Sequence, residues 1–374
     1  MFGGVFANRT VFMTGHTGFK GSWLAFWLHH LGARVVGFSL DPPTRPSLFE
    51  ALGLQHLIHH HYGDIRQLSL LKSLIQETNP DFVFHLAAQS LVRPSYQDPI
   101  GTFEVNAMGT INLLEALRDI DHLCPAVFVT TDKCYENQEW EFGYRETDPL
   151  GGYDPYSSSK AAAEIAIGAY RRSFFRNHPV RIASARSGNV IGGGDWAQDR
   201  ILPDCIRALQ SNLPIEVRNK SATRPWQHVL EPLSGYLCLA ALLAGSEKLA
   251  MSFNFGPRRE SNLTVGDLVE EVLKHWPGTW ADRSNPAAMH EAGLLHLAID
   301  RSETMLGWKP IWDFSKTIEH TLAWYRLAAT ASQVDLRSFT INQIFAYIAE
   351  ARKLGVWWTI FGKAAPENQH EKQP

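Results

Sequence analysis

Residues 9–21 read RTVFMTGHTGFKG, and this stretch predicts how the fold begins. The apolar and β-branched residues up to Thr14 are typical of a short buried strand. Gly15, Gly18 and Gly21 come next and open the segment GSWLAFWLHHLGA, whose apolar residues recur at helical spacing. At a strand-to-helix turn, glycines let backbone amides at the positive end of the helix approach a pyrophosphate. The stretch therefore predicts the first strand and helix of a dinucleotide-binding fold.

Strand-like and helical segments alternate through the first half of the chain. Further strands are expected in residues 34–41, 81–89, 126–132 and 180–192, and another ends in HYGDI at 61–65. This alternation predicts an α/β fold with a Rossmann-like doubly wound parallel sheet. Such sheets bind ligands at the carboxyl ends of their strands, so residues that follow a strand are the first candidates for a site.

The pattern changes after the last of these strands, where short strands mix with helices. A chain of 374 residues exceeds the ~250–300 residues at which single cores stop growing, so we expect two lobes. We predict an NAD-binding Rossmann domain over residues 1–187 with a return segment at about 223–256. A smaller mixed α/β substrate-binding lobe is expected over 188–222 and 257–360, followed by a disordered polar tail at 365–374.

Composition excludes several classes of protein. The net charge is −3 and the pI is about 6.6, so the sequence offers no broad basic face for nucleic acid. No apolar run reaches the ~18 residues of a membrane helix, and the start of the chain lacks signal-peptide features, so no membrane partner is expected. The four Cys residues have no CxxC spacing and are expected to be reduced thiols of a cytoplasmic protein.

The histidine-rich stretch HLIHHHY, residues 56–62, resembles a metal-binding tract. On a strand, however, His59 and His61 point away from His60, and no Cys or carboxylate is spaced to complete a site. The sequence therefore predicts no metal site.

The ends of the strands supply candidates for binding the cofactor. Asp41 ends the second strand, where a carboxylate accepts hydrogen bonds from an adenosine ribose; this favours NAD, although Arg45 nearby leaves NADP open. Asp64 and Ile65 end the third strand and could meet the adenine, but a turn aspartate and a core isoleucine explain them equally well. The other candidates lie in the glycine turn and after the fourth strand: Thr17, Phe19, Lys20, Ala87, Ala88 and Gln89.

The segment YSSSK places Tyr156 and Lys160 four positions apart, on one face of a helix. Tyrosine titrates near ~10, and an adjacent ammonium group lowers that pKa by favouring the phenolate. The phenolate can take a proton from a sugar hydroxyl while hydride leaves the same carbon. This spacing also arises by chance, but its place after a glycine turn and a fifth strand favours a dehydrogenase-type site.

With these motifs, the chain resembles the extended short-chain dehydrogenase/reductase family over nearly its full length. The matching pieces are TGHTGFKG, HLAAQ, the VNAMGT segment around Asn106, and YSSSK. More narrowly, GHTGFKGSWL, AAQSLVRPSY, TTDKCYEN, GNVIGGGDWAQDR and RPWQHVLEPLSGYL look like the nucleotide-sugar 4,6-dehydratases. Relatives that act on dTDP-glucose carry Glu at the position of Lys133, so the resemblance favours the branch that acts on CDP-glucose.

The resemblance implies bound NAD, with Asn106 joining Tyr156 and Lys160 among the cofactor-binding residues. It also implies a homodimer through a four-helix bundle, and a pathway that supplies deoxysugars for cell-surface polysaccharide such as lipopolysaccharide. For the nucleotide-sugar substrate it implies the following residues, of which the last is the weakest because its segment departs from the family pattern: Gln89, Asn189, Arg200, Arg224 and Arg301. Arginine suits a diphosphate, although a solvated surface arginine is the simpler interpretation of each.

The stretch VFVTTDKCY, residues 127–135, carries the catalytic candidates that distinguish a dehydratase. The resemblance implies that Thr131 works with Tyr156 and Lys160 in oxidising carbon 4 of the glucose. It then assigns Asp132 as the acid that protonates the carbon-6 hydroxyl, and Lys133 as the base that removes the carbon-5 proton. Moving a proton from lysine to aspartate costs about 9 kcal/mol in water, so a second interpretation keeps Lys133 charged as an electrostatic stabiliser of the enolate.

Other functions stay open on the sequence alone. A sugar 4-epimerase shares the glycine turn and YSSSK but needs no acid and base after the fifth strand. A dinucleotide sensor without activity has no need to keep Thr131, Tyr156 and Lys160 together. A 4,6-dehydratase for another nucleotide hexose differs only in base and sugar recognition, which the sequence separates poorly.

Overall fold

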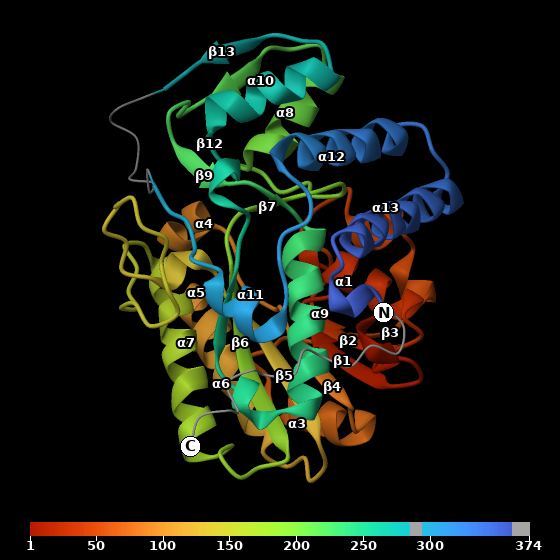
Figure 1. Ribbon diagram of the computed structural model, residues 1–374, viewed down its shortest axis with the longest axis vertical. Coiled ribbons are helices and arrows are strands. Elements are labelled where there is room, and N and C mark those ends of the chain that lie inside the picture. The colour runs from red at the N-terminus through yellow and green to blue at the C-terminus, as the bar shows by residue number, and fades with distance from the viewer. Residues whose placement is uncertain (285–293, 361–374) are drawn as a thin grey trace.

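The structure is a computed structural model that describes residues 1–284 and 294–360, so the tail predicted at 365–374 lies outside the described residues. Its centre is a seven-stranded sheet with the strand order β11-β6-β5-β4-β1-β2-β3 (Figure 1). Every pair of neighbours in this sheet runs parallel, which confirms the predicted doubly wound fold. Its strands are β1 Thr10–Thr14, β2 Arg34–Ser39, β3 His59–Tyr62, β4 Phe82–His85, β5 Cys124–Val129, β6 Val180–Ser187 and β11 Ser252–Phe255.

The strands are apolar on both faces because helices cover both. In β1, Val11 and Met13 belong to one core cluster, whereas Phe12 between them belongs to the other. Side chains alternate between the faces of a strand, so this division follows from the period of two. Figure 1 shows α9 (Leu230–Gly245) and α7 (Pro155–Ser173) on opposite sides of β6.

The helices are distributed over the two faces of the seven-stranded sheet and the second lobe. Helices α1 and α9 pack with the first core cluster, and α3, α6 and α7 with the second. The bounds of the other α-helices are α1 Phe19–His30, α2 Leu48–Ala51, α3 Leu68–Thr78, α4 Val92–Gln97, α5 Pro99–Phe103, α6 Gly109–Leu117, α8 Ile201–Gln210, α10 Val265–His275, α11 Asp300–Leu306, α12 Phe314–Ala328 and α13 Gln333–Lys353. A π-helical turn, Glu104–Met108, joins α5 to α6.

A smaller mixed lobe lies beyond one end of the sheet (Figure 1). Its core includes α8 and α10, which pack beside two pairs of short strands. Strand β8 (Ile215–Val217) runs parallel to β13 (Trp280–Asp282), and β9 (Thr223–Pro225) runs antiparallel to β12 (Asn262–Thr264). Between the lobes, β7 (Val190–Ile191) pairs with β10 (Gln227–His228).

Two details differ from the sequence-based expectation. The strand expected over 180–192 is interrupted, and β6 and β7 belong to different sheets. The end of the range expected for the second lobe packs on the first: the ring of Trp358 stacks on Phe2 at 4.9 Å, and Arg337 in α13 donates to the carbonyl oxygen of Gly53 at 3.0 Å. Local periodicity locates a helix such as α13 but does not indicate which core receives it.

None of the helices in residues 1–284 and 294–360 combines the length and apolar composition that a membrane crossing needs.

Glu231 ties α9 to the C-terminal part of the fold. Its carboxylate is fully buried and accepts hydrogen bonds from the backbone amides of Ile311 at 3.0 Å and Trp312 at 2.7 Å, and from the Tyr347 hydroxyl at 2.7 Å. Burial raises the pKa of Glu231 to about 7, against the opposing effect of these hydrogen bonds.

We expect Glu231→Gln to change how stability depends on pH. The folded protein binds more protons than the unfolded chain between the unperturbed pKa of 4.5 and the folded value of about 7, so the free energy of unfolding falls as pH rises through this window. Glutamine has no proton to lose, and the variant should lack this part of the decline. Urea unfolding at several pH values measures it; parallel declines in both proteins would contradict the expectation.

Candidate active site

A short turn after β5 presents three of the predicted catalytic groups. Thr131 is the N-cap of the 3-10 turn Asp132–Cys134, and its hydroxyl accepts a hydrogen bond from the backbone amide of Lys133 at 3.3 Å. The same hydroxyl donates to Oδ1 of Asp132 at 3.0 Å. Asp132 is only 3% exposed, and burial raises its pKa, with the charge of Lys133 as the largest opposing influence. The carboxyl group is therefore held toward its protonated form.

Helix α7 brings the tyrosine and lysine to this turn. Asp154 caps its N-terminus by accepting from the backbone amide of Ser157 at 3.0 Å, which places Tyr156 in the first helical turn. Helix α7 packs on the turn, and the Thr131 hydroxyl is the largest influence that lowers the pKa of Tyr156, so the turn and the helix meet at the phenol. Burial raises the pKa of Tyr156 to about 12, and burial lowers the pKa of Lys160 to about 8.

Arg200 is the cation that acts most strongly on the phenol. Its charge lowers the pKa of Tyr156, and its guanidinium donates to Oδ2 of Asp195 at 2.9 Å. From the sequence we expected Lys160 to act on the phenol and Arg200 to contact the diphosphate, whereas Lys160 is not among the main influences on the pKa of Tyr156. The structure thus brings Arg200 near enough to the phenol for its charge to act there.

Further cations surround the Asp132 carboxyl group. The charges of Lys20 and Arg224 both lower its pKa, although less than burial raises it. The Lys20 ammonium donates to the Ser187 hydroxyl at 2.9 Å and to the Tyr236 hydroxyl at 3.3 Å. Burial, then the charge of Arg200, lowers the pKa of Lys20 to about 7. Lys20, predicted as a cofactor residue, thus also acts by its charge on Asp132 in the turn after β5.

The three glycines of the turn after β1 differ in whether the packing of the protein itself requires a glycine. Gly15 has φ +75°, and a Cβ there would lie 2.5 Å from the backbone nitrogen of Ala87. A Cβ on Gly21 would lie 2.1 Å from the carbonyl oxygen of Gly15, so the protein itself requires both glycines. Gly18 has φ −73°, and its Cβ would meet no described atom closer than 3.5 Å. Space at Gly18 at the N-terminus of α1 fits a pyrophosphate.

Several residues expected to contact the adenosine half of NAD have contacts within the protein that explain them without a ligand. The Thr17 hydroxyl donates to the carbonyl oxygen of Leu40 at 2.9 Å, which fixes the glycine turn beside the exposed Asp41. Asp64 forms an ion pair with Arg66 at 2.7 Å, and Ile65 is buried in the second core cluster. For Asp64 and Ile65 the structure thus offers a local explanation without a ligand. Phe19 packs against the first core cluster.

Gln89 and Asn106 connect the end of β4 to α7. The Gln89 side chain folds back, donating to the carbonyl oxygen of Leu91 at 3.0 Å and accepting from the Leu91 amide at 2.6 Å. Asn106, in the π-helical turn, donates to the carbonyl oxygen of Gln89 at 2.9 Å and to the Ser159 hydroxyl at 2.8 Å. Both side chains are therefore held by contacts within the protein. Ala87 and Ala88 are partly buried after β4, and Asn189 is partly buried between β6 and β7.

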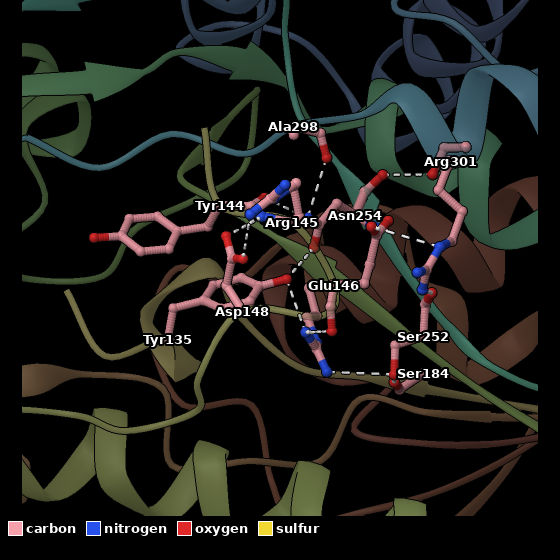
Figure 2. A network of polar contacts seen from close by, with 12 residues as sticks. Tyr135, Tyr144, Arg145, Glu146, Asp148, Ser184, Ser252, Asn254, Ala298 and Arg301 are labelled. Atoms are coloured by element: carbon pink, nitrogen blue, oxygen red, sulfur yellow. Dashed lines mark hydrogen bonds and ion pairs between the residues drawn. The ribbon is translucent and has the colours of Figure 1, made fainter. Parts of the chain in front are cut away.

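Arg301 lies in a polar network at the edge of the sheet (Figure 2). It donates to the carbonyl oxygen of Ser252 at 3.0 Å and lies 3.6 Å from a carboxylate oxygen of Glu146. These contacts explain Arg301 without the nucleotide that the sequence analysis assigned to it. A pocket of about 290 Å³ instead opens beside Pro225, directly after Arg224, and is lined by Pro225, Pro257, Arg258, Arg259, Glu260, Asn262, His296, Leu297, Ala298, Ile299, Asp300 and Glu303.

The histidine tract pairs with the glycine turn. Nδ1 of His60 lies 2.7 Å from Nε2 of His16, and burial lowers the pKa of His16 to about 3. In the part of the chain that the structure describes, no three His, Cys, Asp or Glu residues are grouped as metal ligands would be.

Sequence reasoning missed the buried pair behind the catalytic turn. Glu164 and Arg186 form an ion pair at 2.7 Å with side chains 1% and 4% exposed. One signal was available, because Glu164 follows Lys160 by four positions, as Lys160 follows Tyr156.

The model of the family described as GDP-mannose 4,6 dehydratase matches residues 12–321. The chain is 47% identical over 328 residues to the CDP-glucose 4,6-dehydratase of Salmonella typhimurium, covering 85% of this chain and 91% of that protein. It is 27% identical to a dTDP-glucose 4,6-dehydratase of Xanthomonas campestris, covering 84% of this chain and 93% of the other.

Solved structures share the fold at lower identity. A UDP-glucose 4-epimerase from Stenotrophomonas maltophila with bound NAD has a TM-score of 0.76 at 22% identity, over 86% of this chain and 99% of that one. The dTDP-glucose 4,6-dehydratase of Bacillus anthracis in complex with NAD has a TM-score of 0.72 at 21% identity, over 85% and 96% of the two chains. By its match to the family model and to the Salmonella relative, the chain belongs to the GDP-mannose 4,6-dehydratase family of extended short-chain dehydrogenases/reductases.

Proposed function

We propose that this chain is an NAD-dependent CDP-glucose 4,6-dehydratase, a hydro-lyase that forms CDP-4-keto-6-deoxy-D-glucose. The observation that carries the proposal is the junction of the Asp132–Cys134 turn with α7, where the Thr131 and Tyr156 hydroxyls meet next to a buried carboxyl group. An oxidation site and an acid therefore face the same place. The 47% identity to a CDP-glucose 4,6-dehydratase supports the choice of substrate.

The glycine turn and the groups around it fit NAD. The open space at Gly18 accommodates the pyrophosphate, and Thr17, Asp41 and Asn106 are the proposed contacts at the ribose and nicotinamide ends. When bound, NAD supplies the hydride acceptor for carbon 4 and the hydride donor for carbon 6 of the sugar.

Tyr156 is proposed to take the proton of the carbon-4 hydroxyl. Its pKa is about 12, so the reaction needs cations nearby; Arg200, whose charge lowers this pKa, and Lys160, four positions along α7, are proposed for this role. Thr131 donates to the same oxygen and holds the sugar in line with the phenol. A ketone at carbon 4 then makes the carbon-5 proton acidic.

Elimination of water is assigned to the turn itself. Burial holds Asp132 toward its protonated form, so it can donate its proton to the carbon-6 hydroxyl as water leaves. Lys133 either takes the carbon-5 proton or stabilises the enolate by its charge. The diphosphate is proposed to meet Arg200 and Arg224, with the cytidine in the pocket beside Pro225, which Arg258 and Arg259 line.

A panel of sugar nucleotides tests the function. Purified protein incubated with CDP-, dTDP-, UDP- and GDP-hexoses should convert CDP-glucose to a product lighter by one water that absorbs in alkali as a 4-keto sugar. A product of unchanged mass would indicate a 4-epimerase, and conversion of another nucleotide hexose instead would overturn the assignment of the base.

Lys133→Met separates the oxidation from the elimination. The variant should keep the first oxidation, seen as reduced-cofactor absorbance on adding substrate, but lose exchange of solvent deuterium into carbon 5. The matched control is Asp132→Asn, which should keep that exchange and lose product, because the acid acts after the carbon-5 proton has left. Normal exchange in Lys133→Met would remove Lys133 from the mechanism.

Gly18→Ala tests the cofactor site against packing. Because the added Cβ meets only a 3.5 Å neighbour, the variant should fold and unfold almost like the wild type, yet bind NAD at least ~10-fold more weakly. Gly21→Ala is the comparison, since its Cβ would lie 2.1 Å from a carbonyl oxygen and should destabilise the fold. Thermal unfolding and NAD titration measure both; unaltered NAD affinity in Gly18→Ala would place the pyrophosphate elsewhere.

A homodimer through a four-helix bundle is proposed on the surface formed by α5, the π-helical turn and α7. Exposed apolar side chains there are Ile100 at 73%, Phe103 at 38%, Met108 at 50% and Ile165 at 59%. A groove lined by Pro99, Ile100, Phe103, Glu104, Ala107 and Met108 lies on the same surface. A contiguous group of exposed apolar side chains is typical of a protein–protein interface.

Sedimentation tests the dimer. The double substitution Ile100→Glu and Met108→Glu should shift the wild-type dimer to a monomer, because buried carboxylates oppose the contact. Leu213→Glu, at a side chain 61% exposed in the second lobe, is the control and should stay dimeric. A wild-type monomer, or a dimer untouched by the double substitution, would refute the interface.

The four free thiols suit a reducing compartment, which supports a cytoplasmic enzyme.

A further inference from the structure

The functional face of α7 extends one turn beyond the catalytic lysine. Glu164 lies on this face, four positions after Lys160, and is 4% exposed. One carboxylate oxygen accepts a hydrogen bond from the Thr130 hydroxyl at 2.6 Å. The other accepts from the Ser184 hydroxyl at 2.9 Å and from Nη2 of Arg186 at 2.7 Å. The carboxylate therefore joins α7, the end of β5 and the middle of β6.

Arg186 connects Glu164 to Tyr135, which follows residues 131–134. Its Nη1 donates to the Tyr135 hydroxyl at 2.7 Å, and this hydroxyl donates to Oδ1 of Asn254 at 2.7 Å in β11. Figure 2 shows Tyr135 and Asn254 within this network. Thr130 and Tyr135 are the residues immediately before and after 131–134. One ion pair thus holds both ends of the segment that carries Thr131, Asp132 and Lys133.

The same carboxylate is the main counter-charge of Lys160. Burial would raise the pKa of Glu164, but the guanidinium of Arg186 holds it below its usual value, so Glu164 stays ionised. Burial lowers the pKa of Lys160, and the charge of Glu164 is the largest influence in the opposite direction. The other groups that act on Lys160 or feel its charge are Cys134 from the turn, His85 from β4 and Lys20 from α1.

We propose that the buried Glu164–Arg186 pair positions the active site, holding residues 131–134 against Tyr156 and keeping Lys160 positively charged. The proposal deepens the proposed function and rests on it, because the positioned groups are its catalytic residues. Both members are positioning residues, since each acts through a neighbour. Desolvation offsets most of the attraction in a buried ion pair, so a contribution to stability alone gives little reason for its presence.

The pH at which Lys160 loses its proton tests whether Glu164 keeps this lysine positively charged. In Glu164→Gln, the pH midpoint for acetylation of Lys160, followed by peptide mass spectrometry, should fall by about one unit because a close negative charge is lost. Glu164→Asp keeps the charge and should stay near the wild-type midpoint. Glu231→Gln is the matched control, since above pH 7, where Glu231 is ionised, it removes another buried negative charge away from the turn. A Glu164→Gln midpoint equal to that of the control would overturn the electrostatic role.

Amide hydrogen exchange tests the placement. Thr130→Val removes one hydroxyl at nearly constant volume and leaves the ion pair intact. Exchange of the amides of residues 131–135 should become at least ~10-fold faster in Thr130→Val and Glu164→Gln, because their local opening costs less free energy. Exchange in Glu231→Gln should stay at the wild-type rate in this segment. Unchanged exchange in Glu164→Gln would show that the pair does not hold the turn, and unchanged exchange in Thr130→Val alone would show that the pair acts through Tyr135 and not through Thr130.

Neither measurement needs substrate, so they decide the inference even if the proposed reaction is wrong. With CDP-glucose, Glu164→Gln should lower kcat by ~10-fold or more and leave KM within ~3-fold, since the pair acts on the reacting groups and not on substrate binding. No product from the wild type would reject the function. Product from the wild type, with equal kcat in Glu164→Gln and Glu231→Gln, would reject the positioning role.

Discussion

The approach of Thr131 to the Tyr156 phenol, where α7 packs on the turn after β5, joins the two halves of the candidate active site. It links the turn after β5, which carries the proposed acid Asp132, to helix α7, which carries the phenol of Tyr156 and the ammonium group of Lys160. The link exists because the carboxyl ends of parallel strands lie at one edge of the sheet. The end of β5 and the start of α7 are therefore close together. Chemistry that needs an oxidation and an elimination on neighbouring carbons depends on this junction.

Electrostatics at the junction are governed by burial more than by any one partner. Desolvation is the largest influence on the pKa of Asp132, Tyr156 and Lys160 alike, and in each it favours the neutral form. Cations from other segments, Lys20 and Arg224 among them, oppose this at Asp132. Burial therefore favours the protonated form of Asp132 among several cations, which suits the proposed protonation of a leaving hydroxyl and binding of a diphosphate.

The predictable part of this structure was local. The strand β1 and the turn at Gly15 to Gly21 follow from residue pattern, and the buried turn at Asp132 follows from the strand before it. Arg301 shows the limit: the resemblance named it as the weakest candidate for the substrate, and its contact with the carbonyl oxygen of Ser252 was not predictable. This contact between Arg301 and Ser252 depends on the pairing of β11 with β6. A sequence does not show which carbonyl group, distant along the chain, an arginine will contact. The Glu164–Arg186 pair was hidden for the same reason.

The central claim is that one site both oxidises carbon 4 and eliminates water from carbons 5 and 6. The most direct measurement uses CDP-glucose labelled with deuterium at carbon 4 and locates the label in the product by NMR. The account predicts that the deuterium moves to carbon 6 of a 4-keto-6-deoxy sugar within the same molecule. Deuterium found at carbon 4 of a hexose, or lost to solvent, would contradict it.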